Sequence, residues 1–566
     1  MIVNKQRKKN SIIVQLVVLT MLVSLIAACG GNGNNGGKTN TATNATEQPG
    51  NSSTVEPGAG SSSGKITDKP ITLKWYQVNY AGAELTNMGE SAGFKEIERR
   101  TGVKIEWQHP PSDDQINLML ASGEYPDVIF WNFGSVNRGL KGLIDDGVAI
   151  KLNDLIEQHA PNYKAQLDKY PEIKKMAIMN DGTMPAFYQL DPDPKRLAYS
   201  GHYLRKDWLD KLNLTPPTTI DEWYTVLKSF KDGDPNGNGQ PDEIPYSIAK
   251  VNGGVLGGGT SGITEFAAAW GVLDGFYHHP DTNTLAYGPI EPAFKDFLTT
   301  MNQWYAEGLI DSEYASTDGK SRDTKIQGNL LGSTYGFIGS GIGNNTSAAR
   351  PNNPDFTLLG VTPPVGPAGK PYNYTNDLVQ KVGLQGIITK SNPYPVETVK
   401  FLDYLYSEEG QEILNWGIEG ESYTKVDGKK QFTDNILNNP DGKSPSQAIA
   451  HYAFPINGFT KTMEFEPYSQ INLVLPEQKQ SAENWAKGDT TLNTPVSLEF
   501  SSSDSATLTP MMADINTYKT EMILKFIMGV EPIDKFDDFV KRLKQMGIEE
   551  ALSLYQAAYN DFNARK

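Results

Sequence analysis

The chain has 566 residues, and its 67 acidic residues outnumber its 51 Lys and Arg residues, which gives a formal net charge of −16. This excess of negative charge argues against nucleic acid or an acidic lipid surface as a partner, because phosphate groups are bound by basic patches. Only one cysteine is present, so an internal disulfide is excluded. The length exceeds what one hydrophobic core usually organises, and we expect two domains or lobes.

The first 28 residues have the pattern of an export signal. Four basic side chains precede an apolar stretch from Ile12 to Ala28, and small residues stand directly before Cys29. This order of a basic, an apolar and a small-residue segment predicts a lipoprotein signal peptide at 1–28. The sequence around Cys29 resembles the lipobox of bacterial lipoproteins, which implies cleavage before Cys29 and acylation of its thiol. We therefore expect attachment to the cell membrane through lipid on the extracytoplasmic face, and no mechanism based on a cysteine.

Residues 29–69 are composed largely of Gly, Asn, Ser, Thr, Pro and Glu and contain almost nothing apolar to bury. Such a composition predicts a flexible tether between a lipid anchor and a folded body. Without residues 1–28 the net charge becomes −20, because that segment holds four basic residues and no acidic one.

The body begins with alternating strands and helices. Strands are predicted at 71–77, 103–107 and 125–131, with helices at 94–100 and 114–121 between them. This order is typical of a parallel sheet covered by helices, an α/β architecture. Because ligands bind beyond the carboxyl ends of such strands, polar and aromatic residues at strand ends become candidates for a binding site.

A loop at 234–243 has the spacing of a calcium site. Oxygen-bearing side chains fall at loop positions 1, 3, 5 and 9, and Gly239 at position 6 permits the required turn. The predicted ligands are Asp234, Asn236, Asn238, Gln240 (through its backbone carbonyl), Asp242 and Glu243. Position 12, which is a bidentate Glu in a regular calcium loop, is Pro245 here. The alternative is a plain turn rich in Asn and Gly.

Further along, residues 394–416 have apolar side chains at helical spacing and predict a long amphipathic helix region. His278 and His279 suggest a metal pair at first sight. Neighbouring residues on a strand point to opposite faces, however, and no third ligand is spaced nearby, so we expect an exposed pair without metal.

Six segments of the body together resemble the extracellular solute-binding proteins of carbohydrate ABC importers, including the alginate-oligosaccharide-binding proteins. The segments are 94–107, 118–132, 142–163, 203–247, 388–429 and 536–562. The resemblance implies a two-lobe, periplasmic-binding-protein-like α/β fold with a hinge and a ligand cleft between the lobes. It also implies that the adjacent Asp242 and Glu243 replace the missing distant Glu of the calcium loop.

In that fold each lobe is built from separate stretches of chain. We expect the N-terminal lobe at 70–199 and 332–386, and the C-terminal lobe at 200–331 and 387–566, with the calcium loop in the latter.

Candidate ligand-binding residues combine aromatic rings, which stack on the apolar faces of sugars, with polar groups for the hydroxyls. Strand ends of the first lobe supply Gln77, Asn79, Trp131, Asn132, Tyr188 and Gln189. The resemblance adds Tyr203, Arg205, Trp270, Trp416, Glu419 and Tyr423 from the second lobe. Four other tryptophans, Trp75, Trp107, Trp208 and Trp223, lie within strand or helix patterns and are assigned to packing.

The sequence therefore favours a monomeric extracellular substrate-binding lipoprotein that captures a carbohydrate, expected to be an oligosaccharide, by hinge closure and delivers it to an ABC permease. No nucleophile elbow, His-Glu-x-x-His or phosphate-binding loop occurs, and we expect no enzymatic activity. The alternatives are a secreted glycoside hydrolase or polysaccharide lyase, since 67 acidic residues leave a catalytic carboxylate pair possible, or a peptide-binding receptor.

Overall fold

The computed structural model describes residues 65–67, 69–81, 84–110, 115–136, 139–249, 262–373, 381–494 and 498–565. The predicted leader, Cys29 and the tether up to residue 64 lie outside the described residues. The fold reported below is that of the unit Ser63–Lys566.

A first sheet of five strands has the order β2-β1-β3-β11-β4. Its strands are β1 (Ile71–Tyr76), β2 (Val103–Gln108), β3 (Val128–Trp131), β4 (Phe187–Leu190) and β11 (Val382–Ile388). β1 pairs in parallel with β2 and β3, whereas β11 pairs antiparallel with both β3 and β4. The carboxyl ends of β1 to β4 therefore share one edge of this sheet, as the alternating pattern at the start of the body predicts.

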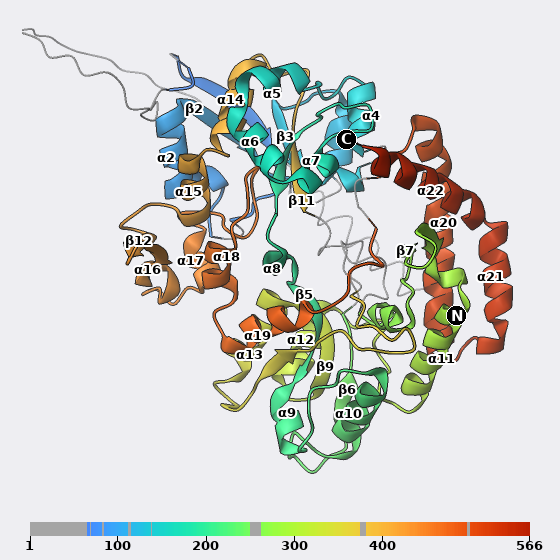
Figure 1. The fold of residues 1–566 in the computed structure, drawn as a ribbon. Coiled ribbons are helices and arrows are strands. Elements are labelled where there is room, and N and C mark those ends of the chain that lie inside the picture. The colour runs from blue at the N-terminus through green and yellow to red at the C-terminus, as the bar shows by residue number, and fades with distance from the viewer. Residues whose placement is uncertain are drawn as a thin grey trace, which may run out of the picture. The chain divides into compact units, whose positions relative to one another are not determined.

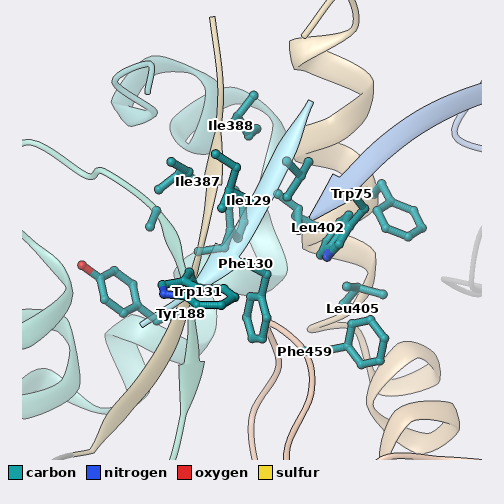
Figure 2. Packing of buried hydrophobic residues seen from close by; sticks show 14 of the residues in the cluster. Trp75, Ile129, Phe130, Trp131, Tyr188, Ile387, Ile388, Leu402, Leu405 and Phe459 are labelled. Atoms are coloured by element: carbon teal, nitrogen blue, oxygen red, sulfur yellow. The ribbon is translucent and has the colours of Figure 1, made fainter. Parts of the chain in front are cut away.

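Helices cover the first sheet and complete its core (Figure 1). They are α2 (Ala92–Thr101), α3 (Gln115–Ser122), α4 (Gly139–Asp145), α5 (Asn153–His159), α6 (Pro161–Lys169), α7 (Pro171–Ala177), α14 (Pro395–Tyr404) and α15 (Glu408–Trp416), with short 3-10 turns η1 (Met88–Glu90) and η2 (Phe133–Ser135). α2 begins at Ser91, whose hydroxyl accepts from the Phe94 N–H, and ends at Gly102 with φ 75°, a left-handed conformation that favours glycine. Figure 2 shows Leu402 and Leu405 packing near strand residues Trp75 and Phe130.

A second sheet of four strands has the order β10-β5-β9-β6. Its strands are β5 (Ser200–Arg205), β6 (Ile244–Tyr246), β9 (Leu331–Phe337) and β10 (Leu358–Gly360). β6 runs parallel to β9, and β5 runs antiparallel to both β9 and β10. The carboxyl ends of β6, β9 and β10 consequently share an edge with the amino end of β5.

The second sheet has its own hydrophobic core, separate from the first. Its helices are α9 (Lys206–Lys211), α10 (Ile220–Asp232), η4 (Thr264–Trp270), η5 (Gly288–Ile290), α11 (Pro292–Ala306), α12 (Gly319–Gln327), the π-helical turn η6 (Ile338–Gly343), α13 (Asn344–Ala349) and α19 (Pro476–Trp485). α10 begins with a capping box in which Thr219 and Glu222 bond reciprocally to backbone N–H groups.

The remaining elements are two hairpins and the C-terminal helices. β7 (Phe276–His279) pairs with β8 (Thr284–Tyr287), and β12 (Tyr423–Val426) pairs with β13 (Lys429–Phe432). Short helices are α8 (Pro194–Leu197), α16 (Asp434–Leu437), α17 (Pro445–Ile449) and α18 (Phe465–Asn472). The chain ends with α20 (Ser502–Ile527), η8 (Ile533–Lys535), α21 (Phe536–Gln545) and α22 (Ile548–Ala564), of which α20 packs against α11 and α22 (Figure 1).

Strand pairing corrects the expected lobe borders. Residues 332–386 were expected in the N-terminal lobe, but β9 and β10 pair with β5 in the second sheet, and only β11 at the end of that range joins the first. Residues 387–566 were expected in the C-terminal lobe, yet apolar residues of α14 and α15, together with Ala450, Phe454 and Phe459, contribute to the first core. Gly332, packed against Phe230 and Trp208, lets β9 lie deep in the second core, which explains why this stretch does not leave it.

The chain thus passes between the two cores at 191–199 and 460–464, and the second core extends to Tyr372 before the chain enters the first sheet at Val382. Among the smaller differences, the predicted helix at 394–416 is two helices, separated before Ser407, whose side chain caps α15. In the described part of the chain no helix has both the length and the apolar character needed to cross a membrane.

Candidate ligand-binding site

The carboxyl-end edge of the first sheet carries an aromatic pair on β1 and β3 and two unsatisfied polar atoms, one on β1 and the other on β4, which lies three strands away from β1. The rings of Tyr76 and Trp131, at the ends of β1 and β3, have centroids 5.9 Å apart. The Tyr76 hydroxyl and the Gln189 Oε1 are buried without a hydrogen-bond partner, and burial raises the pKa of Tyr76. A buried polar atom left unpaired costs about 1–3 kcal/mol, so a ligand hydroxyl reaching these atoms would recover that free energy.

Other predicted residues of this edge hold the loops in place. Gln77 is 0% exposed; its Oε1 accepts from Trp75 Nε1 at 2.6 Å, and its Nε2 donates to the Gly458 carbonyl at 3.0 Å. Asn79 Nδ2 donates to the Leu85 carbonyl at 2.9 Å. The side chains of both residues therefore act within the protein.

Asn132 is exposed, and its Oδ1 accepts from the Gly134 N–H at 3.1 Å, which caps η2. Tyr188 is buried, yet its hydroxyl points away from the hydrophobic cluster in Figure 2. Tyr188 and Gln189 come from β4 and lie on the same edge as Tyr76 and Trp131.

The edge of the second sheet carries an exposed aromatic ring that the sequence analysis did not select. Phe337, the last residue of β9, is 40% exposed, and Tyr199 stacks against it with centroids 6.0 Å apart. Only Phe337 and Tyr394 are exposed among the aromatic residues that the structure describes. Phe337 lies at the carboxyl end of a strand, where ligands bind in α/β sheets, and a π-helical turn rich in glycine follows it.

Polar groups continue from Phe337 along the same face of the sheet. Tyr335, two residues earlier, has its hydroxyl 3.3 Å from the Ser200 Oγ. His202 pairs with Tyr335 in the sheet, and its ring stacks on Phe266 with centroids 4.1 Å apart. Burial lowers the pKa of His202 to about 3, so this imidazole is neutral at physiological pH.

Glu265 follows β6 and lies near the same edge. The residue is 6% exposed; one carboxyl oxygen accepts from the Gly262 N–H, and Oε1 is buried without a partner. Burial raises the pKa of Glu265 to about 8. Gly262 packs against Tyr335, where a Cβ would stand 3.0 Å from the Tyr335 Cβ. Glu265 is thereby connected to the face that carries Phe337.

Of two residues predicted for the second lobe, Arg205 lies away from this edge, whereas Tyr203 packs its ring against Gly341 in the turn that follows Phe337. Because β5 runs antiparallel to β9, Arg205 at its carboxyl end lies on the opposite edge of the sheet. Arg205 is 0% exposed, forms an ion pair with Asp207 at 2.6 Å and lies over the Phe356 ring. Tyr203 is also 0% exposed and packs against Gly341.

Trp416, Tyr423 and Glu419 belong to a small separate cluster around the β12–β13 hairpin. Trp416 is 2% exposed, donates from Nε1 to Glu464 at 3.1 Å and packs on Phe432 with centroids 4.9 Å apart. Tyr423 is buried in the same cluster, and Glu419 forms an ion pair with Lys425 at 3.0 Å. These contacts account for the three side chains as packing and surface groups.

None of the nine tryptophans is exposed. Trp270 ends η4, is 8% exposed and meets Phe297 edge to face at 5.7 Å. Trp75, Trp208 and Trp223 are 0% exposed and Trp107 is half-buried, which confirms their assignment to packing. The sequence does carry one mark of Phe337, because this aromatic residue stands between two glycines, Gly336 and Gly339.

The loop 234–243 is folded around its first and ninth positions. The Asp234 carboxylate accepts from the N–H groups of Gly237, Asn238 and Gly239 at 3.0–3.1 Å. The Asp242 carboxylate accepts from the amides of Asn236 and Asn238 at 2.8–3.1 Å. No group of three or more His, Cys, Asp or Glu side chains arranged for a metal is found in the described ranges, so the amide and carbonyl oxygens would have to complete any site.

The hydrogen bonds within this loop do not involve the side chain of Glu243. Both of its carboxyl oxygens are buried without a partner, and burial, reinforced by the charges of Asp234 and Asp242, raises its pKa. A hard cation would satisfy this set of oxygen ligands.

The histidines at 278 and 279 lie on β7. Both ring nitrogens of His278 contact oxygen atoms, one of Thr491 and one of Asn283.

Residues 85–412 match the family described as bacterial extracellular solute-binding protein, and the chain belongs to this family. Its fold is the two-lobe α/β fold of periplasmic binding proteins, as the resemblance implied.

The chain is similar to the fructooligosaccharide ABC transporter substrate-binding protein FusA of Streptococcus pneumoniae, with 26% identity covering 84% of this chain and 87% of the relative. It is also 26% identical to the lipoprotein LipO of Bacillus subtilis, covering 83% of this chain and 89% of LipO.

Among solved structures, the alginate-binding protein AlgQ2 without calcium ion has 28% identity and a TM-score of 0.68, covering 88% of this chain and 99% of AlgQ2. FusA in complex with kestose has 25% identity and a TM-score of 0.69, covering 88% of this chain and all of FusA. A further FusA structure is of an EF-hand mutant with fructo-nystose.

Proposed function

We propose that this protein captures a carbohydrate, specifically an oligosaccharide, outside the cytoplasm and delivers it to the permease subunits of an ABC importer. The observation that carries the proposal is the exposed ring of Phe337 with its neighbour Tyr199, at the carboxyl-end edge of the second sheet. An exposed ring beside polar groups suits a sugar, which has apolar C–H faces and a rim of hydroxyls. The names of FusA and AlgQ2 as oligosaccharide and alginate binders support the same ligand class.

In this proposal the sugar binds between the two sheet edges, and the lobes close around it about the crossing segments 191–199 and 460–464. The segments are linked to one another by the backbone: the Leu190 N–H donates to the Lys461 carbonyl at 2.8 Å, and the Met463 N–H donates to the Leu190 carbonyl at 2.8 Å. Rotation about a few such residues would bring Tyr76 and Gln189 of the first edge toward Phe337 of the second.

The test is a ligand screen on the soluble body. Oligosaccharides and, as the control for a peptide receptor, oligopeptides are added, and the melting temperature is followed. A specific oligosaccharide at a hundredfold excess over its Kd should stabilise the folded state by about 2.7 kcal/mol. Stabilisation by peptides alone would contradict the proposal.

We also propose that the protein is not an enzyme and acts as a monomer. The bound oligosaccharide should be recovered unchanged by chromatography after prolonged incubation. Appearance of shortened or unsaturated products would instead support the glycoside hydrolase or polysaccharide lyase alternative.

Anchoring through an acylated Cys29 is a further part of the proposal, supported by the lipobox-like sequence and by the similarity to a protein named as a lipoprotein. Cys29→Ser should abolish acylation and release the protein from the membrane fraction. Unchanged retention of this variant in membranes would contradict the anchor.

Finally, we propose that the loop 234–243 holds a structural calcium ion, with Asp234, Asn236, Asn238, Gln240, Asp242 and Glu243 as ligands. The buried, unpaired carboxyl of Glu243 supports this assignment. Addition of a chelator should lower the melting temperature, and Asp234→Ala should abolish that difference. Asp232→Ala, an exposed aspartate just outside the loop, is the matched control and should keep it. An identical melting temperature with and without chelator would show that the loop is a turn that holds no calcium.

A further inference from the structure

The last helix of the chain reaches from the second core to the first lobe. α22 packs its first turn in the second core through Ile548 and Ala551. Further along, its Gln556 side chain accepts from the Leu285 N–H of β8 at 2.7 Å. The 17 residues of α22 span about 25 Å, and its carboxyl end meets α7 and the turn that follows α7 (Figure 1). Because α7 packs in the first core, α22 connects the two lobes without a covalent crossing.

Hydrogen bonds join the carboxyl end of α22 to the first lobe. The Arg565 guanidinium donates from Nε to the Asn180 side chain at 2.6 Å and from Nη1 to the Lys175 carbonyl at 3.2 Å. In the other direction, the Lys175 ammonium donates to the Asn563 carbonyl at 3.1 Å, and the Asn180 N–H donates to the Glu499 carboxylate at 2.8 Å. Each lobe thus supplies both donors and acceptors to the contact.

Glu499 and Phe562 complete this contact from the second-lobe side. Glu499 directly precedes Phe500, which packs against the second core, and its carboxylate lies 3.4 Å from Arg565 Nη2. The Phe562 ring is 5% exposed and has Lys175 at 5.1 Å and Arg565 at 4.9 Å from its centroid. We call Lys175, Asn180, Glu499, Phe562 and Arg565 the C-terminal clasp.

Burial makes the clasp stronger than an ordinary surface contact. The side chains of Arg565 and Glu499 are 5% and 12% exposed, so little water competes for their charges. Exposed ion pairs contribute little to stability, whereas separating a buried pair leaves charges without partners and is costly. The clasp therefore favours the arrangement of the two lobes in which its bonds are made.

That arrangement is the one from which the lobes would close on a ligand. Phe337 of the second sheet edge is 40% exposed, and the Tyr76 hydroxyl and Gln189 Oε1 of the first edge have no partner. A rotation about 191–199 and 460–464 displaces other points of one lobe against the other. Because hydrogen bonds weaken steeply outside a narrow range of distance and angle, a displaced clasp loses its bonds.

We propose that the C-terminal clasp holds the lobes in the ligand-free arrangement and opens when they close on the ligand, so that it sets how tightly the ligand binds. This inference rests on the proposed function and adds a device that regulates it. A ligand has to supply the free energy that opens the clasp, which lowers the observed affinity. Weakening the clasp should therefore tighten binding.

The distance between the lobes can be measured without a ligand. The chain has one cysteine, so in a Cys29→Ser background Ala165→Cys on α6 and Ala348→Cys on α13 supply the only two thiols for spin labels. Both alanines are exposed, one in each lobe. Double electron–electron resonance should give one narrow distance distribution for the parent. Arg565→Ala should add a second population of distances.

Calorimetric titration at pH 7 measures the effect on binding. Kestose, maltotriose, xylotriose and trigalacturonate are titrated into the parent, and the sugar that binds most tightly is then titrated into the variants. Arg565→Ala should bind this sugar about five- to tenfold more tightly than the parent, because less free energy is used to separate the lobes.

Further variants weaken the clasp from each lobe. Asn180→Ala removes the acceptor of the first lobe and leaves the charges in place, and a chain that ends at Ala564 removes the guanidinium. Both should reproduce the effects of Arg565→Ala. Glu499→Gln keeps an oxygen for the Asn180 N–H and should tighten binding less. Arg542→Ala, an exposed arginine of α21, is the matched control and should match the parent in distance and affinity.

The outcomes separate the clasp from the function on which it rests. An unchanged distance distribution in Arg565→Ala, or an affinity equal to or weaker than that of the parent, overturns the inference and leaves the proposed function standing. If Arg565→Ala does not fold, Asn180→Ala, which changes an exposed residue, decides by the same two measurements. Binding of none of the sugars overturns the proposed function, and the distance distributions then decide whether the clasp holds the lobes.

Discussion

The two sheet edges present their aromatic groups differently. The first edge keeps Trp131 buried beside Tyr76 and exposes little of either ring, whereas the second exposes Phe337 by 40%. The first sheet has four strands running the same way, so the carboxyl ends of these four strands all lie at the same edge. The second contains β5, which runs against its neighbours, and the residue at the end of β5 lies on the far side. The rule that ligands bind at carboxyl ends has to be applied strand by strand.

Arg205→Ala, at the edge of the second sheet opposite Phe337, should have the largest effect on the free energy of unfolding. Removing the guanidinium leaves Asp207 as a buried carboxylate without its partner, which should lower the free energy of unfolding by about 3–5 kcal/mol. Denaturant unfolding measures this, and titration at low temperature should give an unchanged ligand Kd. A weakened Kd with unchanged stability would place Arg205 in the site after all.

Trp416→Ala should have a comparable effect on stability, because the ring is 2% exposed and packs on Phe432. Truncation of a buried tryptophan costs about 3–5 kcal/mol in the free energy of unfolding. Ligand affinity of the folded fraction, read by calorimetry, should stay within error of the parent. Loss of affinity without loss of stability would return Trp416 to the list of stacking residues.

Phe337→Ala should show the reverse pattern. Its ring is partly exposed, so folding should be little affected, while the loss of a stacked apolar surface should weaken ligand binding by about 1–3 kcal/mol. Tyr394→Ala, which removes the other ring that is exposed among the described aromatic residues, is the matched control and should bind as the parent does. Equal effects of the two substitutions would show that the second edge is not the binding face.

Tyr76→Phe is the most delicate test and concerns the first edge alone. The hydroxyl has no partner within the protein, so its removal should not lower the melting temperature, but affinity should fall by about 0.5–1.5 kcal/mol. Tyr287→Phe removes another buried, unpaired hydroxyl, located in the second core, and should change neither the melting temperature nor the affinity for the ligand. If both variants bind equally well, the first edge contributes no hydrogen bond through Tyr76.

Local sequence patterns located the start of the first sheet, because alternating apolar residues and short amphipathic helices are encoded over a few neighbouring positions. They could not place β11 between β3 and β4, since this pairing joins residues far apart in the chain and its strand direction has no local signal. The same limit explains why α14, α15 and Phe459, which pack in the first core, were expected in the other lobe.

For the site, residue type was a weaker guide than position. Tryptophans suggested stacking on a ligand, but large rings also fill cores. Of the nine tryptophans, eight are buried and Trp107 is half-buried. Gln77 and Asn79 were correctly located near a strand end, yet their side chains bond to the backbone of adjoining loops. Whether a polar group serves the fold or a ligand depends on neighbours that only the folded chain supplies.

The insertion of β11 into the first sheet has a consequence for how the molecule forms. The Gln385 side chain accepts from the Phe133 N–H across 252 residues of sequence, so this sheet stays incomplete until about two thirds of the polypeptide is available. Contacts of such long range are slow to form, because a large loop has to close before they contribute any stability. A chain that threads through a membrane pore with its amino end leading would therefore stay unfolded during most of its passage. Completion of the first sheet would begin only when β11 had emerged, after the strands of the second sheet.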